Sequence, residues 1–349
     1  MGTRNFLQKH AKLNYLQRCF RRRKNADFVE EVMAIGYDPM RLHVLQMGKE
    51  NQGKMIYIAK TMGCDGFFAE LRFLLNELYF ADKLGLVPVL TMSEKSSYAE
   101  KEPINGTTNP FEYYFLQPTE VSLASAENSF AVVEHNWIQR DFIKMNLGFK
   151  SGYAPTDEYF EAISSLMKKY LRFNADTERK VCDVAKTLLG EGKTLGIHIR
   201  GADFKRHYDN HPNMVTIQEY AESVEETLKE HCFDKIFLAT DDSEAIEVFT
   251  AKFGDKLVYY KDVIRTSGDE TVMKSNVDRP LHHYHLGLEV IRDSYTLSLC
   301  DGLIAGLSNV SIFSRLMKQS EGKAYDYLKI LDKGIKSFTG GENNGQIGK

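Results

Sequence analysis

The sequence predicts an α/β fold built from parallel, doubly wound sheets. In the second half of the chain, strand, loop and helix recur four times, the order that a parallel sheet with covering helices requires. In the first half, one further strand–turn–helix–strand unit runs from Lys54 to Leu90. The chain has 349 residues, of which 43% are hydrophobic, so it is long enough for two such domains.

The first unit opens with a buried strand over residues 54–60, followed by a glycine turn from Gly63 to Gly66. Apolar residues at helical spacing predict a helix that starts at Phe67, and Leu86–Leu90 is the next strand. The turn lacks the G-x-G-x-x-G fingerprint, so it is weak support for a dinucleotide site. Its glycines serve equally well to let the backbone turn tightly into the helix.

The first 24 residues hold eight Lys or Arg and no acidic residue, with Phe6, Leu13, Leu16 and Phe20 at helical spacing. Two interpretations are open. One is a basic amphipathic helix that lies on an anionic membrane face. The other, slightly favoured because the apolar stripe is thin, is an ordinary surface helix that packs on the body of the protein.

Residues 91–155 are rich in loops and aromatic side chains, such as those of Asn109–Phe115, Trp137 and Phe142. Loops of this length either build a substrate cleft or carry aromatic side chains that plug the core beneath them. From Thr156 to about Leu189 the pattern is helical, and Asn174 is the expected N-cap of a helix that runs to Gly190. We expect the domain boundary in this region.

The second half supplies the remaining elements. The predicted strands are Thr194–Arg200, Lys235–Thr240, Leu257–Tyr260 and Gly302–Ala305. The predicted helices are Ile217–His231, Glu244–Phe253, His285–Leu299 and Ile312–Met317. From Ser337 the tail is rich in Gly and Asn, which predicts disorder.

Composition excludes several classes of protein. The net charge of −3 gives no basic field of the kind that binds nucleic acid. The five cysteines are widely spaced without a C-x-x-C pair, which favours reduced thiols in a cytosol over disulfides or a zinc site. No apolar run approaches ~18 residues, and the basic N-terminus lacks the apolar segment of a secretory signal. We therefore expect a cytoplasmic protein.

Polar residues follow three of the predicted parallel strands, where the carboxyl ends meet at one edge of the sheet. The three groups are His198, Arg200 and Asp203; Thr240, Asp241 and Asp242; and Ser308, Asn309 and Ser311. An arginine fork binds two anionic oxygens at once, and a helix start with small hydroxyl side chains suits a phosphate. Together the groups predict a pocket for a nucleotide diphosphate.

Structural roles are open for the same residues. Arg200 and Asp203 can pair across a turn, and Asp241–Asp242 can cap the helix that starts near Ser243. The run His282–His285 suggests a metal site, but no cysteine lies near it and Asp278 is the nearest carboxylate. A loop that leads into a helix is much the better interpretation, so no metal is expected.

Three blocks of the sequence resemble the GDP-fucose-dependent fucosyltransferases. The blocks are His198–Asp203 (HIRGAD), Phe237–Asp242 (FLATDD), and Asp293–Asp301 (DSYTLSLCD) followed by Ser308–Ser311 (SNVS). Their order and separation are similar to those of the α1,6-fucosyltransferases, and more loosely to those of the α1,2- and protein O-fucosyltransferases. The resemblance covers about residues 195–320, and the Gly63–Leu90 unit resembles the family less specifically.

The resemblance implies a GT-B fold, in which two Rossmann-like domains face each other across a cleft and the C-terminal domain holds the donor. The limits expected on this basis are a basic helical extension over 1–50, an acceptor domain over 51–178, a donor domain over 179–336 and a disordered tail over 337–349. It also implies an inverting reaction without a metal or other cofactor.

The family's site residues map onto matching positions of this sequence. The resemblance implies that Arg200 holds the diphosphate, that His198 lies beside the nucleoside, and that Asp293 recognises guanine or its surroundings. The remaining donor contacts implied are Thr240, Asp241, Asp242, Ser308, Asn309 and Ser311.

The chain also departs from the family pattern. The α1,6 enzymes carry two consecutive arginines in the first block, and here the second position is Gly201. Either one diphosphate contact is missing or Lys205 or Arg206 supplies it. The glutamate that some members use as a base has no clear counterpart. Asp203, His207 and Asp209 are candidates in that loop, with Asp203 and Asp209 preferred, although a structural pairing of Asp203 with Arg200 is slightly favoured.

The sequence therefore predicts a bacterial-type enzyme of polysaccharide biosynthesis that moves fucose from GDP-fucose to a glycan hydroxyl. It is expected in the cytoplasm or at the inner membrane face. One alternative is the same scaffold with another nucleotide sugar. A second is a catalytically silent relative that binds nucleotide or glycan. A nicotinamide-dependent oxidoreductase is disfavoured because the glycine fingerprint is absent.

Overall fold

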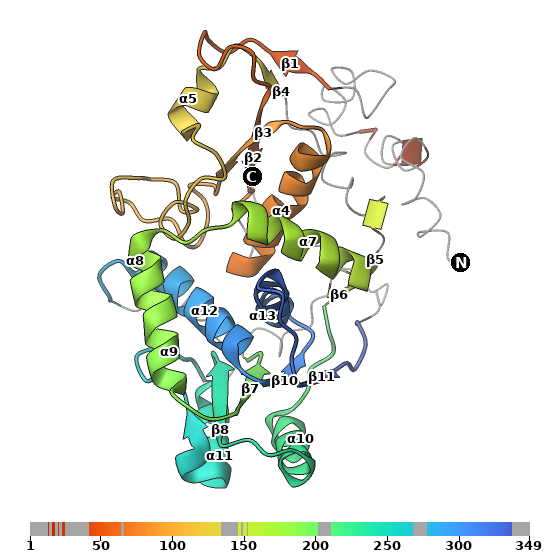
Figure 1. Ribbon diagram of the computed structural model, residues 1–349, viewed down its shortest axis with the longest axis vertical. Coiled ribbons are helices and arrows are strands. Elements are labelled where there is room, and N and C mark those ends of the chain that lie inside the picture. Colours follow the sequence, from red (N-terminus) through yellow and green to blue (C-terminus); the bar gives the residue numbers. More distant parts are fainter. Residues whose placement is uncertain are drawn as a thin grey trace. The chain divides into compact units, whose positions relative to one another are not determined.

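The computed structural model describes residues 42–63, 66–133, 153–201, 211–267 and 278–336, with a few positions within 13–24 and 146–151. The chain divides into two compact units (Figure 1). Unit 1 consists of Met1–Lys186, Val277–Ser298 and Phe313–Ala324, and unit 2 of Thr187–Asn276, Leu299–Ile312 and Tyr325–Lys349. None of the described helices is both long and apolar enough to cross a membrane.

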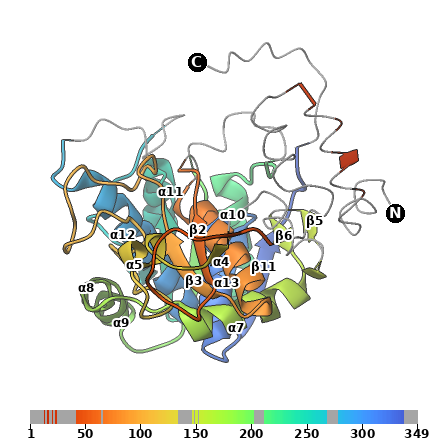
Figure 2. The ribbon, with the colours of Figure 1, turned by 90° about the horizontal axis from the view of Figure 1, so that it is seen from above.

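Unit 1 contains a four-stranded sheet with the order β1-β4-β2-β3. The strands are β1 (Val44–Leu45), β2 (Ile56–Lys60), β3 (Val87–Thr91) and β4 (Val132–Val133). β2 runs parallel to β3 and β4, and β1 is antiparallel to β4. Helix α4 (Phe67–Lys83) connects β2 to β3 and packs against both strands (Figure 2), so the strand–turn–helix–strand unit predicted from the sequence is confirmed.

A glycine at position 63 is required by the turn that leads toward α4. Its φ of +79° lies in the left-handed region, and a Cβ there would lie 2.7 Å from the backbone nitrogen of Ser96. The first amide of α4, that of Phe67, donates to the hydroxyl of Tyr98 at 2.8 Å. The turn therefore brings the helix start against the loop that follows β3.

The described part of the loop-rich region plugs the core of unit 1. Phe111, Tyr113, Tyr114 and Phe115 are all at most 1% exposed, so for these aromatics the core interpretation is confirmed. Along the chain, the short helix α5 (Leu123–Glu127) follows these aromatics and precedes β4. Trp137 and Phe142 lie outside the described residues.

Side-chain amides complete the outer edge of β3. The backbone N–H of Leu90 donates to Gln117 at 2.9 Å, and its carbonyl accepts from Gln117 and Asn109 at 2.7 and 3.0 Å. Pro88 has no N–H to satisfy. Loop side chains thus take the place of a further strand at this edge.

The helices of the segment from Thr156 to Leu189 follow the predicted pattern. They are α7 (Asp157–Tyr170), α8 (Ala175–Thr177), the π-helical segment η1 (Glu178–Asp183) and α9 (Val184–Leu189), which runs into unit 2. A short antiparallel pair, β5 (Phe149–Ser151) and β6 (Ala154–Pro155), precedes them. The predicted N-cap is confirmed, since the Asn174 side chain accepts from the backbone of Thr177 at 2.9 Å.

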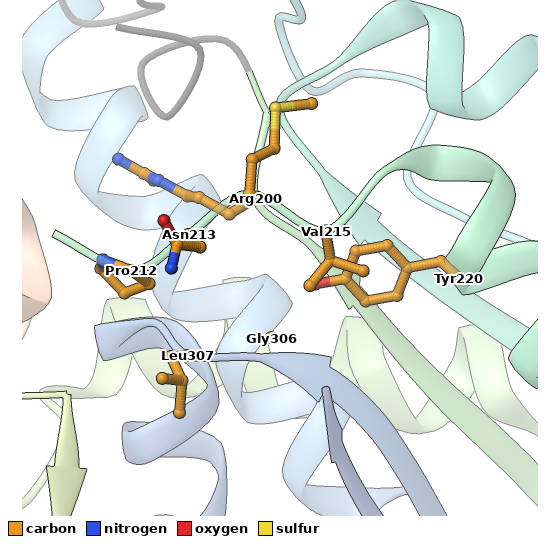
Figure 3. A pocket seen from close by; sticks show the side chains of 8 residues that line it. Arg200, Pro212, Asn213, Val215, Tyr220, Gly306 and Leu307 are labelled. Carbon is orange, nitrogen blue, oxygen red and sulfur yellow. The ribbon is translucent and has the colours of Figure 1, made fainter. Parts of the chain in front are cut away.

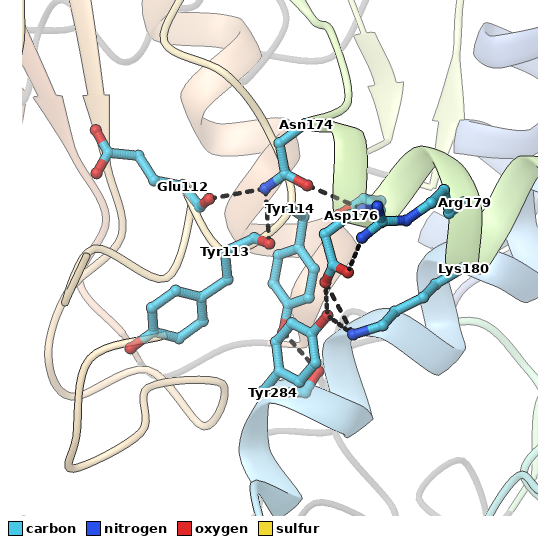
Figure 4. Close-up of polar contacts among 9 residues, drawn as sticks. Glu112, Tyr113, Tyr114, Asn174, Asp176, Arg179, Lys180 and Tyr284 are labelled. Carbon is cyan, nitrogen blue, oxygen red and sulfur yellow. Dashed lines mark hydrogen bonds and ion pairs between the residues drawn. The ribbon is translucent and has the colours of Figure 1, made fainter. Parts of the chain in front are cut away.

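Polar contacts join this helical segment to the aromatic residues of unit 1 (Figure 4). The Asn174 amide donates to the carbonyls of Glu112 and Tyr113 at 3.0 and 2.9 Å. The Asp176 carboxylate accepts from Lys180 at 2.8 Å and from the Tyr284 hydroxyl at 3.0 Å. The Asn174 side chain thus caps a helix and also binds two carbonyls of the preceding loop.

Unit 2 is built on a five-stranded, entirely parallel sheet with the order β11-β10-β7-β8-β9. The strands are β7 (Thr194–Ile199), β8 (Lys235–Thr240), β9 (Leu257–Val258), β10 (Gly302–Gly306) and β11 (Tyr327–Leu331). Four of them match predicted strands, and β11 was not predicted. The central strand β7 is buried along its whole length.

Helices α10 (Ile217–Glu230) and α11 (Ser243–Phe253), followed by the 3-10 turn η3 (Gly254–Lys256), alternate with these strands. Thr216 and Glu219 form a reciprocal capping box at the start of α10. Helices α12 (His282–Leu299) and α13 (Asn309–Ser320) each begin three residues before their predicted starts at His285 and Ile312. The buried core includes Ile197, Val224, Ile236, Phe249 and Ile304.

Candidate functional site

The carboxyl ends of three parallel strands meet at one edge of the unit 2 sheet. β7 lies between β10 and β8, and His198 is in register with Ala305 on one side and Ala239 on the other. Arg200 follows the end of β7, Asp241 follows β8, and Ser308 follows β10. The expected convergence of the strand ends is therefore present within this unit.

His198 is a buried, neutral histidine. Its side chain is 5% exposed, and its Nδ1 atom lies 3.2 Å from the hydroxyl oxygen of Ser308. Burial, reinforced by the positive charge of Arg200 and partly opposed by Asp241, lowers the pKa of His198 to about 3. The imidazole therefore acts at neutral pH as a hydrogen-bonding group without charge.

Arg200 has Asp241 as a carboxylate neighbour. The Nη1 atom of Arg200 lies 3.9 Å from Oδ2 of Asp241, and both side chains remain more than a quarter exposed. The other carboxylate oxygen of Asp241 accepts the backbone N–H of Gly201 at 2.8 Å. The guanidinium thus lies beside a carboxylate that also accepts a hydrogen bond from the residue following Arg200.

The geometry explains why residue 201 is glycine. A Cβ at this position would lie 2.7 Å from Oδ1 of Asp241 and 2.8 Å from Cβ of Asp242. The residues that follow β8 therefore leave no room for a side chain at position 201. An arginine there, as the resemblance expects, would require them to move.

The side chains of Thr240 and Asp242 accept hydrogen bonds from backbone N–H groups just after β8. Asp242 is 2% exposed and accepts the backbone N–H of Glu244 at 2.9 Å, so its predicted capping of the helix is confirmed. The Thr240 hydroxyl accepts the N–H of Asp242 at 3.1 Å. Of the three residues at the end of β8, Asp241 is the most exposed.

Ser308 and Ser311 face each other at the start of α13. Each is 3% exposed, and the N–H of each donates to the hydroxyl of the other, at 3.3 and 3.0 Å. These hydroxyls, predicted to contact phosphate, are thus engaged with the protein. Asn309 between them is half-buried.

A pocket opens beside Arg200 (Figure 3). The chain from Pro212 to Val215, which precedes α10, lines it together with Tyr220, Gly306 and Leu307. Figure 3 shows the side chains of Val215 and Tyr220 lying together, away from the Arg200 guanidinium. Sequence reasoning missed this wall because residues 212–215 carry no motif.

Asn213 and Arg265 are two further polar residues that the sequence did not single out. The Asn213 amide is fixed by donating to the carbonyl of Lys333 at 2.8 Å. The Arg265 guanidinium donates to three carbonyls, including that of Thr240 at 3.2 Å. Arg265 follows a predicted strand in a short segment that already holds Lys261 and Asp262, so its charge alone did not set it apart.

Of the other predicted site residues, the structure describes Asp293. Asp293 is on α12 within unit 1. Asp203, Lys205, Arg206, His207 and Asp209 lie outside the described residues. Within the described ranges no group of three or more His, Cys, Asp or Glu side chains could hold a metal ion. In the His282–His285 run, His283 contacts the carbonyl of Ser97 at 2.8 Å.

Comparison with known proteins supports the fold. No family model matches the sequence, and no curated protein matches it. The structure resembles that of the fucosyltransferase NodZ from Bradyrhizobium, with a TM-score of 0.50 and 13% identity over 76% of this chain and 93% of that one. NodZ α-1,6-fucosyltransferase soaked with GDP-fucose gives 0.48 and 14% identity, covering 76% and 92%. POFUT1 in complex with GDP-fucose gives 0.44 and 14%, covering 80% and 99%.

The likeness to the Bradyrhizobium structure identifies the fold class. This chain has the mixed α/β fold with parallel sheets that is found in the GT-B fucosyltransferase NodZ. The resemblance inferred from the three sequence blocks is thereby confirmed at the level of fold.

Proposed function

We propose that the chain is a glycosyltransferase that transfers fucose from GDP-fucose to a hydroxyl group of a glycan. The observation that carries the proposal is the position of Arg200. It follows the central strand of a parallel sheet and lines a pocket with Gly306 and Leu307, which precede the start of α13. Ligands of open α/β sheets bind at such strand ends.

The proposed chemistry uses a charged leaving group. The bond between the anomeric carbon of fucose and the β-phosphate oxygen breaks, and GDP departs with the electron pair. The acceptor oxygen forms the new glycosidic bond from the opposite face, which inverts the anomeric centre. The guanidinium of Arg200 stabilises the negative charge as it develops on the diphosphate. The resemblance to the family supports inversion and reaction without a metal.

The acceptor hydroxyl also needs a base within hydrogen-bond reach. Asp203 and Asp209 remain the proposed candidates. We further propose that Asp293 contacts the guanine end of the donor and that Thr240, Asp241, Asp242 and Asn309 line its binding site. Residues of 91–155 are proposed to select the acceptor.

The larger assignments are proposals of the same kind. They comprise the arrangement of two facing domains with the limits 1–50, 51–178, 179–336 and 337–349, a cytoplasmic location, and peripheral membrane contact through residues 1–24. A second candidate function is transfer from another nucleotide sugar. It is favoured by Gly201, which stands where the resemblance expects a second arginine.

The test is a thermal-shift panel on the full chain with GDP, UDP, CMP, ADP and GDP-fucose, each with and without EDTA. A ligand at a hundred times its Kd adds about 2.7 kcal/mol of stability, which a melting curve resolves easily. We expect a shift with GDP and GDP-fucose that EDTA does not change, and none with the other nucleotides.

The other outcomes separate the alternatives. A shift with UDP or CMP in place of GDP would mean that the scaffold uses another donor. A GDP shift without release of GDP from GDP-fucose in the presence of glycan acceptors would favour a silent binding relative. The absence of any shift would contradict the proposed nucleotide pocket.

A further inference from the structure

A chain of hydrogen bonds connects His198 to the backbone through two buried serines. His198 Nδ1 lies 3.2 Å from Oγ of Ser308, and the Ser308 hydroxyl donates to Oγ of Ser311 at 3.2 Å. The Ser311 hydroxyl in turn donates to the carbonyl of Gly306 at 2.9 Å. All three side chains are at most 5% exposed, so water contributes little to satisfying them.

Counting protons decides which ring nitrogen of His198 carries hydrogen. A carbonyl only accepts, and the Ser311 hydroxyl lies 2.9 Å from the carbonyl oxygens of both Gly306 and Ser308, so its single proton goes to a backbone carbonyl. If Nδ1 is protonated, Ser308 Oγ accepts from Nδ1 and from the N–H of Ser311 at 3.0 Å, and its own proton reaches Ser311. Both of its lone pairs and its proton are then used.

The opposite tautomer makes one hydrogen bond fewer. With Nδ1 bare, Ser308 must give its only proton to the imidazole, and the contact between the two serine oxygens loses its hydrogen. In a buried network the fully satisfied arrangement is the more stable one, and hydrogen bonds aligned in one direction strengthen one another. The surroundings therefore select the tautomer with hydrogen on Nδ1.

We propose that Ser308 and Ser311 are positioning residues that hold His198 as the Nδ1–H tautomer, so that its Nε2 atom is presented as an acceptor for an N–H or O–H group of the nucleotide. The link to the nucleotide rests on the proposed function, whereas the tautomer does not. Among the described residues, Nε2 has no hydrogen-bond partner.

The groups around His198 are compatible with this state. Arg200 at the end of β7 disfavours a positive charge on the imidazole, and Asp241 at the end of β8 opposes it only in part. Just before α13, His198 meets the uncharged hydroxyl of Ser308, which is hydrogen-bonded in turn to that of Ser311. A neutral ring with one donor and one acceptor is the result.

The tautomer is measured by long-range proton–nitrogen NMR on the full chain labelled with 15N-histidine. The His198 signals are assigned by their loss in His198→Gln. We expect a protonated Nδ1 and a bare Nε2 between pH 6 and pH 8. A spectrum with hydrogen on Nε2 would overturn the proposed role of Ser308 and Ser311 in fixing the tautomer, whatever the protein binds.

The positioning role is tested with Ser308→Ala, Ser308→Thr and a matched control. Ser308→Ala should yield a mixture of tautomers and weaken GDP binding about three- to tenfold, the value of one hydrogen bond, whereas Ser308→Thr retains the hydroxyl and should recover both. The control is Thr156→Ala, which removes a similar helix-capping bond, that from Tyr159 at 3.3 Å in unit 1. It should change neither readout.

The outcomes separate the two proposals. Unchanged GDP affinity in Ser308→Ala with an altered tautomer would overturn the ligand role of Nε2. Equal weakening in Thr156→Ala would also overturn it, because the effect would then be one of stability alone. If wild-type protein did not bind GDP, the proposed function would fail. The NMR spectrum of the free protein would still show whether His198 is held as the Nδ1–H tautomer.

Discussion

Arg200 and its neighbours show how one residue sets the chemistry of a strand end. The carboxylate of Asp241 lies 3.9 Å from the guanidinium and is anchored to the N–H of Gly201. A diphosphate brings more negative charge than one carboxylate and matches the arginine fork with two oxygens. On the proposed function, we expect the diphosphate to compete with Asp241 for the guanidinium, while Asp241 keeps its contact with the N–H of Gly201.

Replacement of this arginine should affect transfer and leave the fold intact. We expect Arg200→Ala to lower kcat/KM with GDP-fucose by about 100-fold or more, as the loss of a transition-state donor does elsewhere. Arg200→Lys, which keeps the charge and loses the fork, should fall in between. Steady-state kinetics and melting temperatures measure both. Arg179→Ala, at an exposed arginine paired with Asp176, is the control. Near wild-type kcat/KM in Arg200→Ala would refute the diphosphate role.

Sequence reasoning placed polar residues at this edge of the sheet and missed the hydrogen bonds that some of them make within the protein. Ser308 and Ser311 are three apart at a helix start, and this spacing suits a phosphate site and a mutual capping contact alike. Only the three-dimensional arrangement distinguishes these uses. The reason for Gly201 was also hidden, because the side chains that crowd it follow a different strand.

At the scale of elements, Asn174 is an unusually connected helix cap. Its oxygen caps α8, and its amide nitrogen donates to two carbonyls of the buried 109–115 loop. The backbone N–H of the same residue donates to the carbonyl of Tyr114 at 3.0 Å. A helix end and an aromatic segment about sixty residues earlier are thus tied by one side chain.

Two substitutions separate these contributions. Asn174→Ser keeps a capping oxygen and loses the amide, and Asn174→Ala loses both. We expect Asn174→Ala to be less stable than Asn174→Ser by about 1 kcal/mol, the value of a cap, and both to be less stable than wild type. Urea unfolding midpoints measure this. Ser122→Ala, which removes only the cap of α5, is the reference. Equal midpoints for the two Asn174 variants would show that the cap contributes nothing.

The elements that sequence patterns predicted well are those with one clear period. The buried strands β7 and β8 match their predicted bounds almost residue for residue. β11 was missed because, as an edge strand, it is only partly buried and its apolar pattern is interrupted by Lys329. The early starts of α12 and α13 were missed because both helices begin with polar residues, His282–His283 and Asn309.

For the molecule as a whole, buried His198 links stability to pH. Its pKa is lowered from 6.5 to about 3 in the folded chain, so below pH 6.5 only the unfolded chain takes up this proton. Stability should therefore fall as pH drops from 6.5 toward 3, by about 2 kcal/mol between pH 7 and pH 5. The pKa of Glu219 is lowered from 4.5 to about 2, chiefly by the hydrogen bond from Lys333. Its contribution to stability is therefore lost only below about pH 4.5.

The difference between wild type and His198→Gln isolates the histidine contribution. In chemical unfolding at pH 5, 6 and 7, the free energy of unfolding of wild type should fall as the pH is lowered. That of His198→Gln should lack this fall. A variant that loses as much stability as wild type over this range would mean that His198 is not kept neutral by burial.

The fold class followed from the alternation of elements, whereas the composition of the units did not. The chain passes between the units after Lys186, Asn276, Ser298, Ile312 and Ala324, and two of these points fall within or at the end of α12 and α13. A helix that belongs to two units carries no local signal of that fact. Such sharing depends on tertiary contacts, and the spacing of apolar residues along the sequence does not reveal them.

The contact between Tyr114 and α12 has a consequence for biosynthesis. The rings of Tyr114 and Tyr284 stack with centroids 5.5 Å apart, and the Tyr114 hydroxyl donates to a carbonyl 170 residues further along the chain. At about 5–20 residues per second, a ribosome needs on the order of 10–30 s to make that partner. During this interval the aromatic segment of the nascent chain lacks its contact with α12, and exposed apolar surface of this kind is what chaperones bind.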